Sequence, residues 1–166
     1  MNFNKFVSNL YVLTIYFCQS TNANLVSKNT ILFKAEMETY KDREDLIIMF
    51  TDSYDVVLLA EPETILAEFY KMKANVVFGA EPFCWPDSTL KDSYPAIEAG
   101  KRFLNSGGFI GYAKDIYDVV THHEIQNYED DQLYYTKLYL DENFRKQHKF
   151  KLDHKSVIFQ VSLFII

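Results

Sequence analysis

Apolar residues in the first half of the chain fall into two patterns, short uninterrupted runs and a helical repeat. The run from Leu46 to Phe50 and the run from Val76 to Ala80 are both bounded by polar residues. Such runs are typical of strands buried on both faces of a sheet. Between them, Glu61-Pro62 opens a helical pattern with Ile65, Leu66, Phe69 and Met72 facing inward. This strand, helix and strand predict an α/β fold with a mostly parallel sheet and flanking helices.

The flanking segments carry weaker patterns. Residues 31–40, 116–123 and 131–140 are expected to be helical, the first with Phe33, Met37 and Tyr40 on one face. Pro-rich and Gly-rich positions predict an aromatic loop over residues 82–95 and a turn at residues 105–108, followed by a short strand at 109–113. Residues 9–16 predict a first buried strand. The apolar stretch from Phe6 to Phe17, with small residues up to Ala23, is also compatible with a secretory signal peptide, but Asn9 and Thr14 interrupt the run and favour the strand.

Two carboxylates, Asp52 and Asp55, follow the first buried run directly. Ligands of parallel sheets collect at the carboxyl ends of strands, so both side chains are expected in a crevice there. A divalent cation relieves the repulsion between two such charges. Carboxylate oxygens suit Mn²⁺ or Mg²⁺, and a cation of this kind bridges a diphosphate. The alternative is that residues 51–55 simply form a turn, where Asp and Ser are common.

Three other segments are candidates for a site, each with a plainer interpretation. The pair Gly107-Gly108 allows the backbone to approach a ligand closely, or makes a tight turn. The acidic run at residues 129–131 suits the first turn of a helix, where the helix dipole stabilises negative charge. Trp85 is the only tryptophan, and core packing is the plain interpretation for it. The four histidines show no spacing that predicts metal ligation.

Composition narrows the possible partners. The chain has 166 residues, 48% of them hydrophobic, which fits one domain with an ordinary core. The net charge is −6 and no local basic patch is evident in the sequence, which argues against nucleic acid and anionic lipid as partners. The apolar run from Leu10 to Cys18 is too short for a membrane span. Cys18 and Cys84 form one disulfide or none, and they do not report the compartment.

Five segments in order along the chain give a stronger signal than any single motif: FTDSYDVV, AEPFCWP, GKRFLNSGGFIGYA, EDDQLYYTKLYLD and LDHKSVIFQ. From about Leu32 to Gln160 this series resembles the glycosyltransferase domain of the multifunctional procollagen lysyl hydroxylases. The resemblance implies a Rossmann-like GT-A fold that uses UDP-galactose or UDP-glucose with Mn²⁺ to glycosylate collagen hydroxylysine. It further implies the endoplasmic reticulum lumen or secretion as the location, and a homodimer as a common assembly.

The donor side of the site follows from the same resemblance. Asp52 and Asp55 match the metal-binding aspartates of the family, and Tyr54 between them matches a tyrosine that lies against the uracil. The family has a third metal ligand, a histidine, beyond the segment that ends in IFQ. His154 is not that histidine.

On the acceptor side, Trp85 matches a tryptophan of the acceptor and sugar region. Asp130 and Asp131 match paired aspartates proposed to act at the sugar and the acceptor. A carboxylate in that place orients or deprotonates the hydroxylysine hydroxyl. The iron- and 2-oxoglutarate-dependent hydroxylase domain of the family has no counterpart here, so hydroxylation is not expected of this chain.

The resemblance also divides the chain. Residues 1–30 form a divergent N-terminal segment, residues 31–160 the glycosyltransferase-like domain, and residues 161–166 a divergent apolar tail. Between residues 17 and 30 the chain is shorter than the family and unlike it. We therefore expect an incomplete domain that is inactive by itself, and the alternative function is that of an inactive copy retaining only binding.

Overall fold

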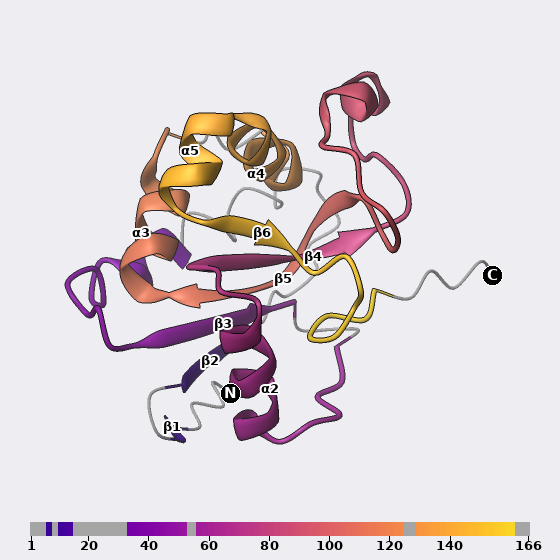
Figure 1. The fold of residues 1–166 in the computed structure, drawn as a ribbon. Coiled ribbons are helices and arrows are strands. Elements are labelled where there is room, and N and C mark those ends of the chain that lie inside the picture. The colour runs from indigo at the N-terminus through magenta and orange to yellow at the C-terminus, as the bar shows by residue number, and fades with distance from the viewer. Residues whose placement is uncertain (1–5, 8–9, 15–32, 53–55, 125–128, 162–166) are drawn as a thin grey trace, which may run out of the picture.

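One sheet of six strands forms the centre of the molecule. The computed structural model describes residues 6–7, 10–14, 33–52, 56–124 and 129–161. The strand order is β1-β2-β3-β5-β4-β6, shown in Figure 1. The strands are β1 (Phe6–Val7), β2 (Leu10–Thr14), β3 (Ile47–Thr51), β4 (Val76–Glu81), β5 (Phe103–Tyr112) and β6 (Phe150–Leu152).

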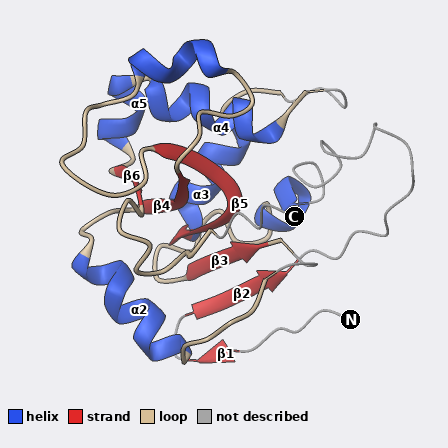
Figure 2. Ribbon diagram, turned by 90° about the vertical axis from the view of Figure 1, so that its right-hand side faces the viewer, coloured by secondary structure: helices blue, strands red, loops and turns tan. Residues whose placement is uncertain are grey.

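Helices cover both faces of this sheet. Helix α2 (Pro62–Lys71) lies on one face, and α3 (Ala113–Thr121), α4 (Asp131–Leu140) and α5 (Glu142–Gln147) lie on the other, as Figure 2 shows. A 3₁₀ helix, η1 (Ser88–Ser93), stands in the loop after β4. The expected α/β fold with flanking helices is therefore confirmed. No helix among the residues described above is long and apolar enough to cross a membrane.

The direction of β5 corrects the expectation of a mostly parallel sheet. β2 pairs with β3 and β4 pairs with β6 in parallel, but β5 lies antiparallel between β3 and β4. A loop rather than a crossover helix joins β4 to β5, so the chain reverses before it enters the sheet. The strands β2, β3, β4 and β6 still share one direction, so their carboxyl ends meet at one edge of the sheet.

The expected turn at residues 105–108 is wrong, because these residues lie inside β5. The strand is thus longer than the predicted segment 109–113. The pairing of β4 with β5 shifts register between Phe78 and Gly79, and this irregularity lies beside the glycine pair. At Gly108 a Cβ atom would stand 2.7 Å from the ring of Phe159, so the missing side chain makes room for that ring. The glycine pair does mark a place where other atoms come close to the backbone, as expected. At Gly108 these atoms belong to the protein itself, and the glycine lies within a strand rather than in a turn.

Alternate residues of the buried strands face opposite sides of the sheet and pack under different helices. Ile48 and Phe50 belong to the cluster under α3, α4 and α5, while Ile47 and Met49 belong to the cluster under α2. Every residue of β3 and β4 is buried, as predicted for strands covered on both faces. Across the three central strands Phe50, Phe109 and Phe78 stack with ring centroids 4.7 and 4.5 Å apart. The core therefore fixes the register of β3, β5 and β4.

Most other predicted elements are confirmed. The first strand is present as β2, with Leu10 buried. Residues 33–37 are helical with Phe33 and Met37 buried, and α2 turns Ile65, Leu66 and Phe69 inward. α4 has the predicted bounds of 131 and 140. The sequence analysis did not anticipate α5 and β6, whose apolar positions are few and short.

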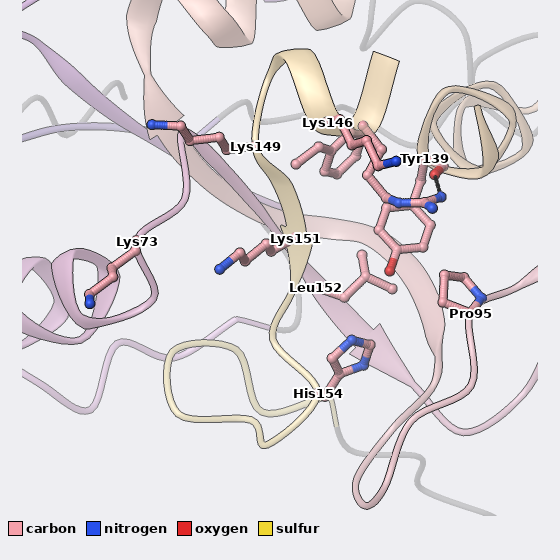
Figure 3. A pocket seen from close by; sticks show the side chains of 10 residues that line it. Lys73, Pro95, Tyr139, Lys146, Lys149, Lys151, Leu152 and His154 are labelled. Carbon is pink, nitrogen blue, oxygen red and sulfur yellow. Dashed lines mark hydrogen bonds between the residues drawn. The ribbon is translucent and has the colours of Figure 1, made fainter. Parts of the chain in front are cut away.

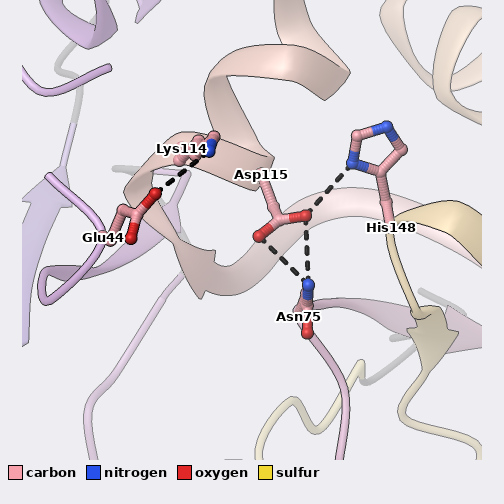
Figure 4. Close-up of polar contacts among 5 residues, drawn as sticks. All are labelled: Glu44, Asn75, Lys114, Asp115 and His148. Atoms are coloured by element: carbon pink, nitrogen blue, oxygen red, sulfur yellow. Dashed lines mark hydrogen bonds and ion pairs between the residues drawn. The ribbon is translucent and has the colours of Figure 1, made fainter. Parts of the chain in front are cut away.

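A partly buried polar network holds the starting end of β4. The Asp115 carboxylate, in the first turn of α3, accepts two hydrogen bonds of 3.2 Å from Nδ2 of Asn75. Its Oδ1 also lies 3.1 Å from Nδ1 of His148, which follows α5 (Figure 4). The neighbouring pair Lys114 and Glu44, 3.1 Å apart, is exposed. Asp115 thereby joins α3, α5 and the approach to β4 at the end of the sheet where that strand begins.

Candidate active site

Acidic residues collect at the opposite edge of the sheet, where β3 and β4 end. Asp52 directly follows β3, and its backbone N–H donates to the carbonyl oxygen of Gly107 at 2.9 Å. A Cβ atom at Gly107 would lie 3.0 Å from Oδ2 of Asp52. Only glycine therefore lets the Asp52 carboxylate lie against β5 without displacement. The predicted place of Asp52 at the end of a buried strand is confirmed, and its position beside Gly107 was not anticipated.

Glu81 is the last residue of β4 and is buried. Its Oε1 accepts a 2.6 Å hydrogen bond from Nε2 of Gln132, which also donates to the carbonyl oxygen of Trp85 at 3.1 Å. The Gln132 Oε1 accepts from the backbone N–H of Ser106 at 3.1 Å. Burial raises the pKa of Glu81, while hydrogen bonds from Gln132 and Asn105 oppose that rise. Gln132 thus joins α4, β5 and the loop after β4 around a buried acid.

Asp131 is the most perturbed acid of the site. Its pKa is raised from 3.8 to about 6, mainly by burial and also by the negative charges of Asp130 and Asp52. Asp52 and Asp131 come from distant parts of the sequence, but the fold brings the two acidic motifs together. The Asp52 backbone bonds to Gly107, and Gln132, next to Asp131, accepts a hydrogen bond from the neighbouring Ser106. Carboxylates crowded in this way are typical of sites that bind a cation or transfer a proton.

Asp130 has a structural role of its own. It is the N-cap of α4, and its Oδ1 accepts a 2.9 Å hydrogen bond from the backbone N–H of Leu133. The plain interpretation of the acidic run as a helix start is therefore confirmed for this residue. Asp131 occupies the first turn of the same helix, and the negative charge of Asp52 is among the causes that raise its pKa.

Trp85 is 63% exposed, so the plain interpretation that it packs in the core is wrong, and its assignment to the acceptor and sugar region stays a prediction. The loop that carries it is ordered by polar contacts instead. Sγ of Cys84 contacts the carbonyl oxygen of Asp87 at 3.2 Å, and the Trp85 carbonyl oxygen is held by Gln132. The same glutamine that binds Glu81 therefore fixes the loop that presents the indole to solvent. Cys84 is a free thiol, and Cys18 lies outside the described residues.

Asp55 and Tyr54 also lie outside the described residues, so the predicted metal pair and uracil contact stay predictions. Within the described part of the chain no three His, Cys, Asp or Glu side chains form a group that would hold a metal. His154 is occupied elsewhere, since its Nδ1 lies 2.7 Å from the carbonyl oxygen of Lys101. The donor chemistry of Asp52 and Asp131 nevertheless suits a hard cation, because both contribute carboxylate oxygens to one crowded place.

Sequence reasoning missed Glu81, Gln132 and Asn105. Glu81 had the same signal as Asp52, since it follows the apolar run of β4 directly. Gln132 stood next to the predicted Asp130 and Asp131, but only the fold shows that its side chain reaches Glu81. Asn105 was assigned to a turn, whereas its Oδ1 accepts from the backbone N–H of Gly107 at 3.1 Å within β5.

Comparisons with known proteins show the family to which the chain belongs. The family model described as PLOD GT domain matches residues 27–163. The chain is 52% identical over 127 residues to the human multifunctional procollagen lysine hydroxylase and glycosyltransferase LH3, covering 76% of this chain and 17% of the relative. The corresponding Caenorhabditis elegans protein is 49% identical over 126 residues, covering 75% and 17%. Human procollagen-lysine,2-oxoglutarate 5-dioxygenase 2 is 47% identical over 129 residues, covering 78% and 18%. The chain therefore spans less than a fifth of the length of these relatives.

Proposed function

Because the chain belongs to the family of PLOD glycosyltransferase domains, we propose, in place of the inactivity expected from the sequence, that it transfers a sugar from a UDP-sugar to hydroxylysine of procollagen. The observation that carries the proposal is the meeting of Asp52 and Asp131 at the carboxyl ends of the parallel strands. That edge is where α/β sheets bind nucleotides. The named relatives, which include a glycosyltransferase acting on procollagen lysine, supply the sugar and the acceptor class.

In this proposal Asp52, together with Asp55, holds a Mn²⁺ ion, and Tyr54 lies against the uracil. The ion supplies positive charge to the diphosphate that leaves during transfer. The crowding of Asp52 against Asp131 supports a cation here, because binding one removes the repulsion that raises the Asp131 pKa. Gly107 keeps the space beside the Asp52 carboxylate open.

The acceptor side of the proposal rests on Asp131, Trp85 and Glu81. Asp131 takes up or orients the proton of the hydroxylysine hydroxyl, and Asp130 begins the helix that holds it in place. The exposed indole of Trp85 offers an apolar face to a sugar ring. Glu81 and Gln132 connect the Trp85 loop to the start of α4, so the two acceptor residues are held by one network. We place this activity in the endoplasmic reticulum lumen, where procollagen is modified.

Calorimetric titration of UDP with and without Mn²⁺ tests the donor site. We expect Mn²⁺-dependent binding in the unaltered chain and its loss in Asp52→Ala, since one carboxylate fewer leaves too little negative charge for the ion. Asp92→Ala, which removes an exposed acid in η1, is the matched control. Undiminished metal-dependent binding in Asp52→Ala would contradict the assignment.

Transfer assays separate binding from chemistry. With UDP-glucose or UDP-galactose and a hydroxylysine peptide as acceptor, Asp131→Asn is expected to lower turnover far more than UDP affinity. A residue that acts on the acceptor hydroxyl contributes mainly in the transition state. If Asp131→Asn transferred sugar at the normal rate, the acidic run would be only a helix start.

A further inference from the structure

A groove along β6 gathers cations from segments that are far apart in the sequence. It has a volume of about 540 Å³, and its lining, drawn in Figure 3, includes Lys73, Arg145, Lys146, Lys149 and Lys151. The sequence analysis found no basic patch, and that expectation is wrong because this cluster forms only in the fold. Lys146 pairs with Glu142, and Nζ of Lys151 donates a 2.8 Å hydrogen bond to the Met72 carbonyl oxygen. The chain itself thus engages part of this charge, whereas an aromatic surface beside the acidic site lies open.

Two aromatic side chains project from the loop that follows β4. Phe83 and Trp85 are each 63% exposed. Cys84 between them turns inward, since it packs against the core and its Sγ contacts the Asp87 carbonyl oxygen at 3.2 Å. Among the described residues, neither exposed ring packs against another aromatic ring. We call Phe83 and Trp85 the aromatic ridge.

The aromatic ridge is fixed in place beside the acidic site. Nε2 of Gln132 donates to the Trp85 carbonyl oxygen at 3.1 Å and to the buried Glu81 carboxylate at 2.6 Å. Gln132 follows Asp131 in the first turn of α4, so one side chain joins the ridge to the helix start that carries this acid. Farther along the loop, Asp87 caps η1 by accepting a 2.9 Å hydrogen bond from a backbone N–H. The ridge is therefore a preformed surface next to Asp131.

The occupant follows from the proposed function, on which this inference rests. A hydroxylysine side chain that reaches Asp131 leaves its own backbone and its sequence neighbours outside the acidic site. Collagen chains are rich in proline and adopt the polyproline II conformation, which has no internal hydrogen bonds. Surfaces lined by exposed aromatic side chains bind chains of this kind. We propose that the aromatic ridge binds the proline-rich segment beside the acceptor hydroxylysine, as a single chain in the polyproline II conformation.

Phe83 separates this inference from the binding of a sugar. A sugar ring needs one aromatic face, and the proposed function assigns the indole of Trp85 to it. Phe83 has no part in that assignment, yet most of its ring is in contact with water. Covering this ring with the apolar atoms of proline removes apolar surface from water, which is favourable. Phe83 is therefore the residue that selects the peptide around the acceptor.

Trp85 provides the measurement, because it is the only tryptophan and its fluorescence reports on the ridge without a label. The probe is a single-chain peptide of Gly-Pro-Pro repeats, and the comparison peptide has serine in place of proline. With the full chain, the proline peptide should reduce acrylamide quenching of Trp85 about twofold and bind about fivefold more tightly than the serine peptide. Phe83→Ala keeps the reporter and should weaken binding of the proline peptide about fivefold. Tyr70→Ala, which removes a 52% exposed aromatic side chain from α2, is the matched control and should change binding less than about twofold.

Transfer assays give a second readout. With a hydroxylysine peptide flanked by prolines, Phe83→Ala should raise KM about fivefold and change kcat less than about twofold, because the peptide contact is made equally in the ground state and the transition state. The two experiments fail separately. Shielding of Trp85 by the proline peptide in a chain that transfers no sugar would contradict the proposed function and support the ridge, and transfer without shielding would do the opposite.

Three results would overturn the inference. Equal binding of the proline and serine peptides would remove its selectivity. Undiminished binding of the proline peptide by Phe83→Ala, in a chain shown by circular dichroism to be folded, would remove Phe83 from the surface. Shielding of Trp85 by galactose or glucose but not by the proline peptide would assign the ridge to the sugar alone.

Discussion

Near the two ends of β4 lie partly or fully buried acids in opposite situations. At the start of the strand, Asp115 accepts hydrogen bonds from Asn75 and contacts His148, so its charge is matched by donors. At the other end, burial and neighbouring carboxylates raise the pKa of Asp131, and burial raises that of Glu81. A satisfied network stabilises the fold, whereas a crowded one costs stability and persists where function requires it. The difference separates the structural end of the sheet from its active end.

The largest effect is expected at the structural end. Asp115→Ala leaves Nδ2 of Asn75 and Nδ1 of His148 without their shared acceptor, which should lower the free energy of unfolding by about 2–3 kcal/mol. Urea denaturation followed by circular dichroism measures it. Asp115→Asn keeps one acceptor oxygen. Its free energy of unfolding should lie between that of the unaltered chain and that of Asp115→Ala. If Asp115→Ala lowered the free energy of unfolding by no more than an ordinary surface substitution does, the structural role assigned to Asp115 would be contradicted.

At the end with the candidate site, removal of an acidic charge is expected to stabilise the chain rather than destabilise it. The folded chain holds the Asp131 proton more tightly than the unfolded chain does, so this group favours folding below pH 3.8. That contribution disappears as the pH rises to about 6. In the absence of metal, Asp131→Asn should therefore raise stability at pH 7 by about 2 kcal/mol and leave it unchanged near pH 3. Denaturant midpoints measured from pH 3 to pH 8 test this, with Asp92→Asn as the control. A variant less stable at pH 7 would show that the Asp131 charge is compensated.

The sequence predicted the strand ends better than the contacts between them. Asp52 and the start of α4 were placed correctly because a buried strand and an N-cap leave local patterns. Gln132 could not be connected to Glu81, since that contact depends on how α4 packs against β4 and β5. The reversal of β5 was missed for a related reason: its glycines resembled a turn, and strand direction is decided by pairing partners far away. β6 has only two buried positions, too few for a periodic signal.

A smaller effect would rank the charges that act on Asp131. The charge of Asp130 raises its pKa more than that of Asp52 does. Asp130→Asn, which retains a capping side chain, should therefore lower the Asp131 pKa more than Asp52→Asn does. Carbon-13 NMR titration of the aspartate carboxyl groups, without metal, gives both values. The reverse order would mean that the charge of Asp52 acts on Asp131 more strongly than the charge of Asp130 does.

The smallest effect is expected for the exposed pair beside the satisfied network. Glu44→Gln removes the ion pair with Lys114, whose partners are both largely exposed, and no measurable change in the unfolding midpoint should follow. Thermal unfolding of this variant alongside Asp115→Ala compares an exposed contact with a buried one on the same helix. A loss equal to that of Asp115→Ala would remove the distinction between them.

The antiparallel strand at the centre of the sheet has a consequence for synthesis of the chain. β3 and β4 both pair with β5, yet β5 is translated after both of them. A nascent chain that has reached β4 has two apolar strands with no partner between them, and the aromatic stack through Phe109 cannot form. Exposed apolar strands of this kind attract chaperones and other chains. Release of residues 103–112 from the ribosome is therefore the moment at which the sheet can close, and slow translation before it prolongs the period in which the chain needs protection.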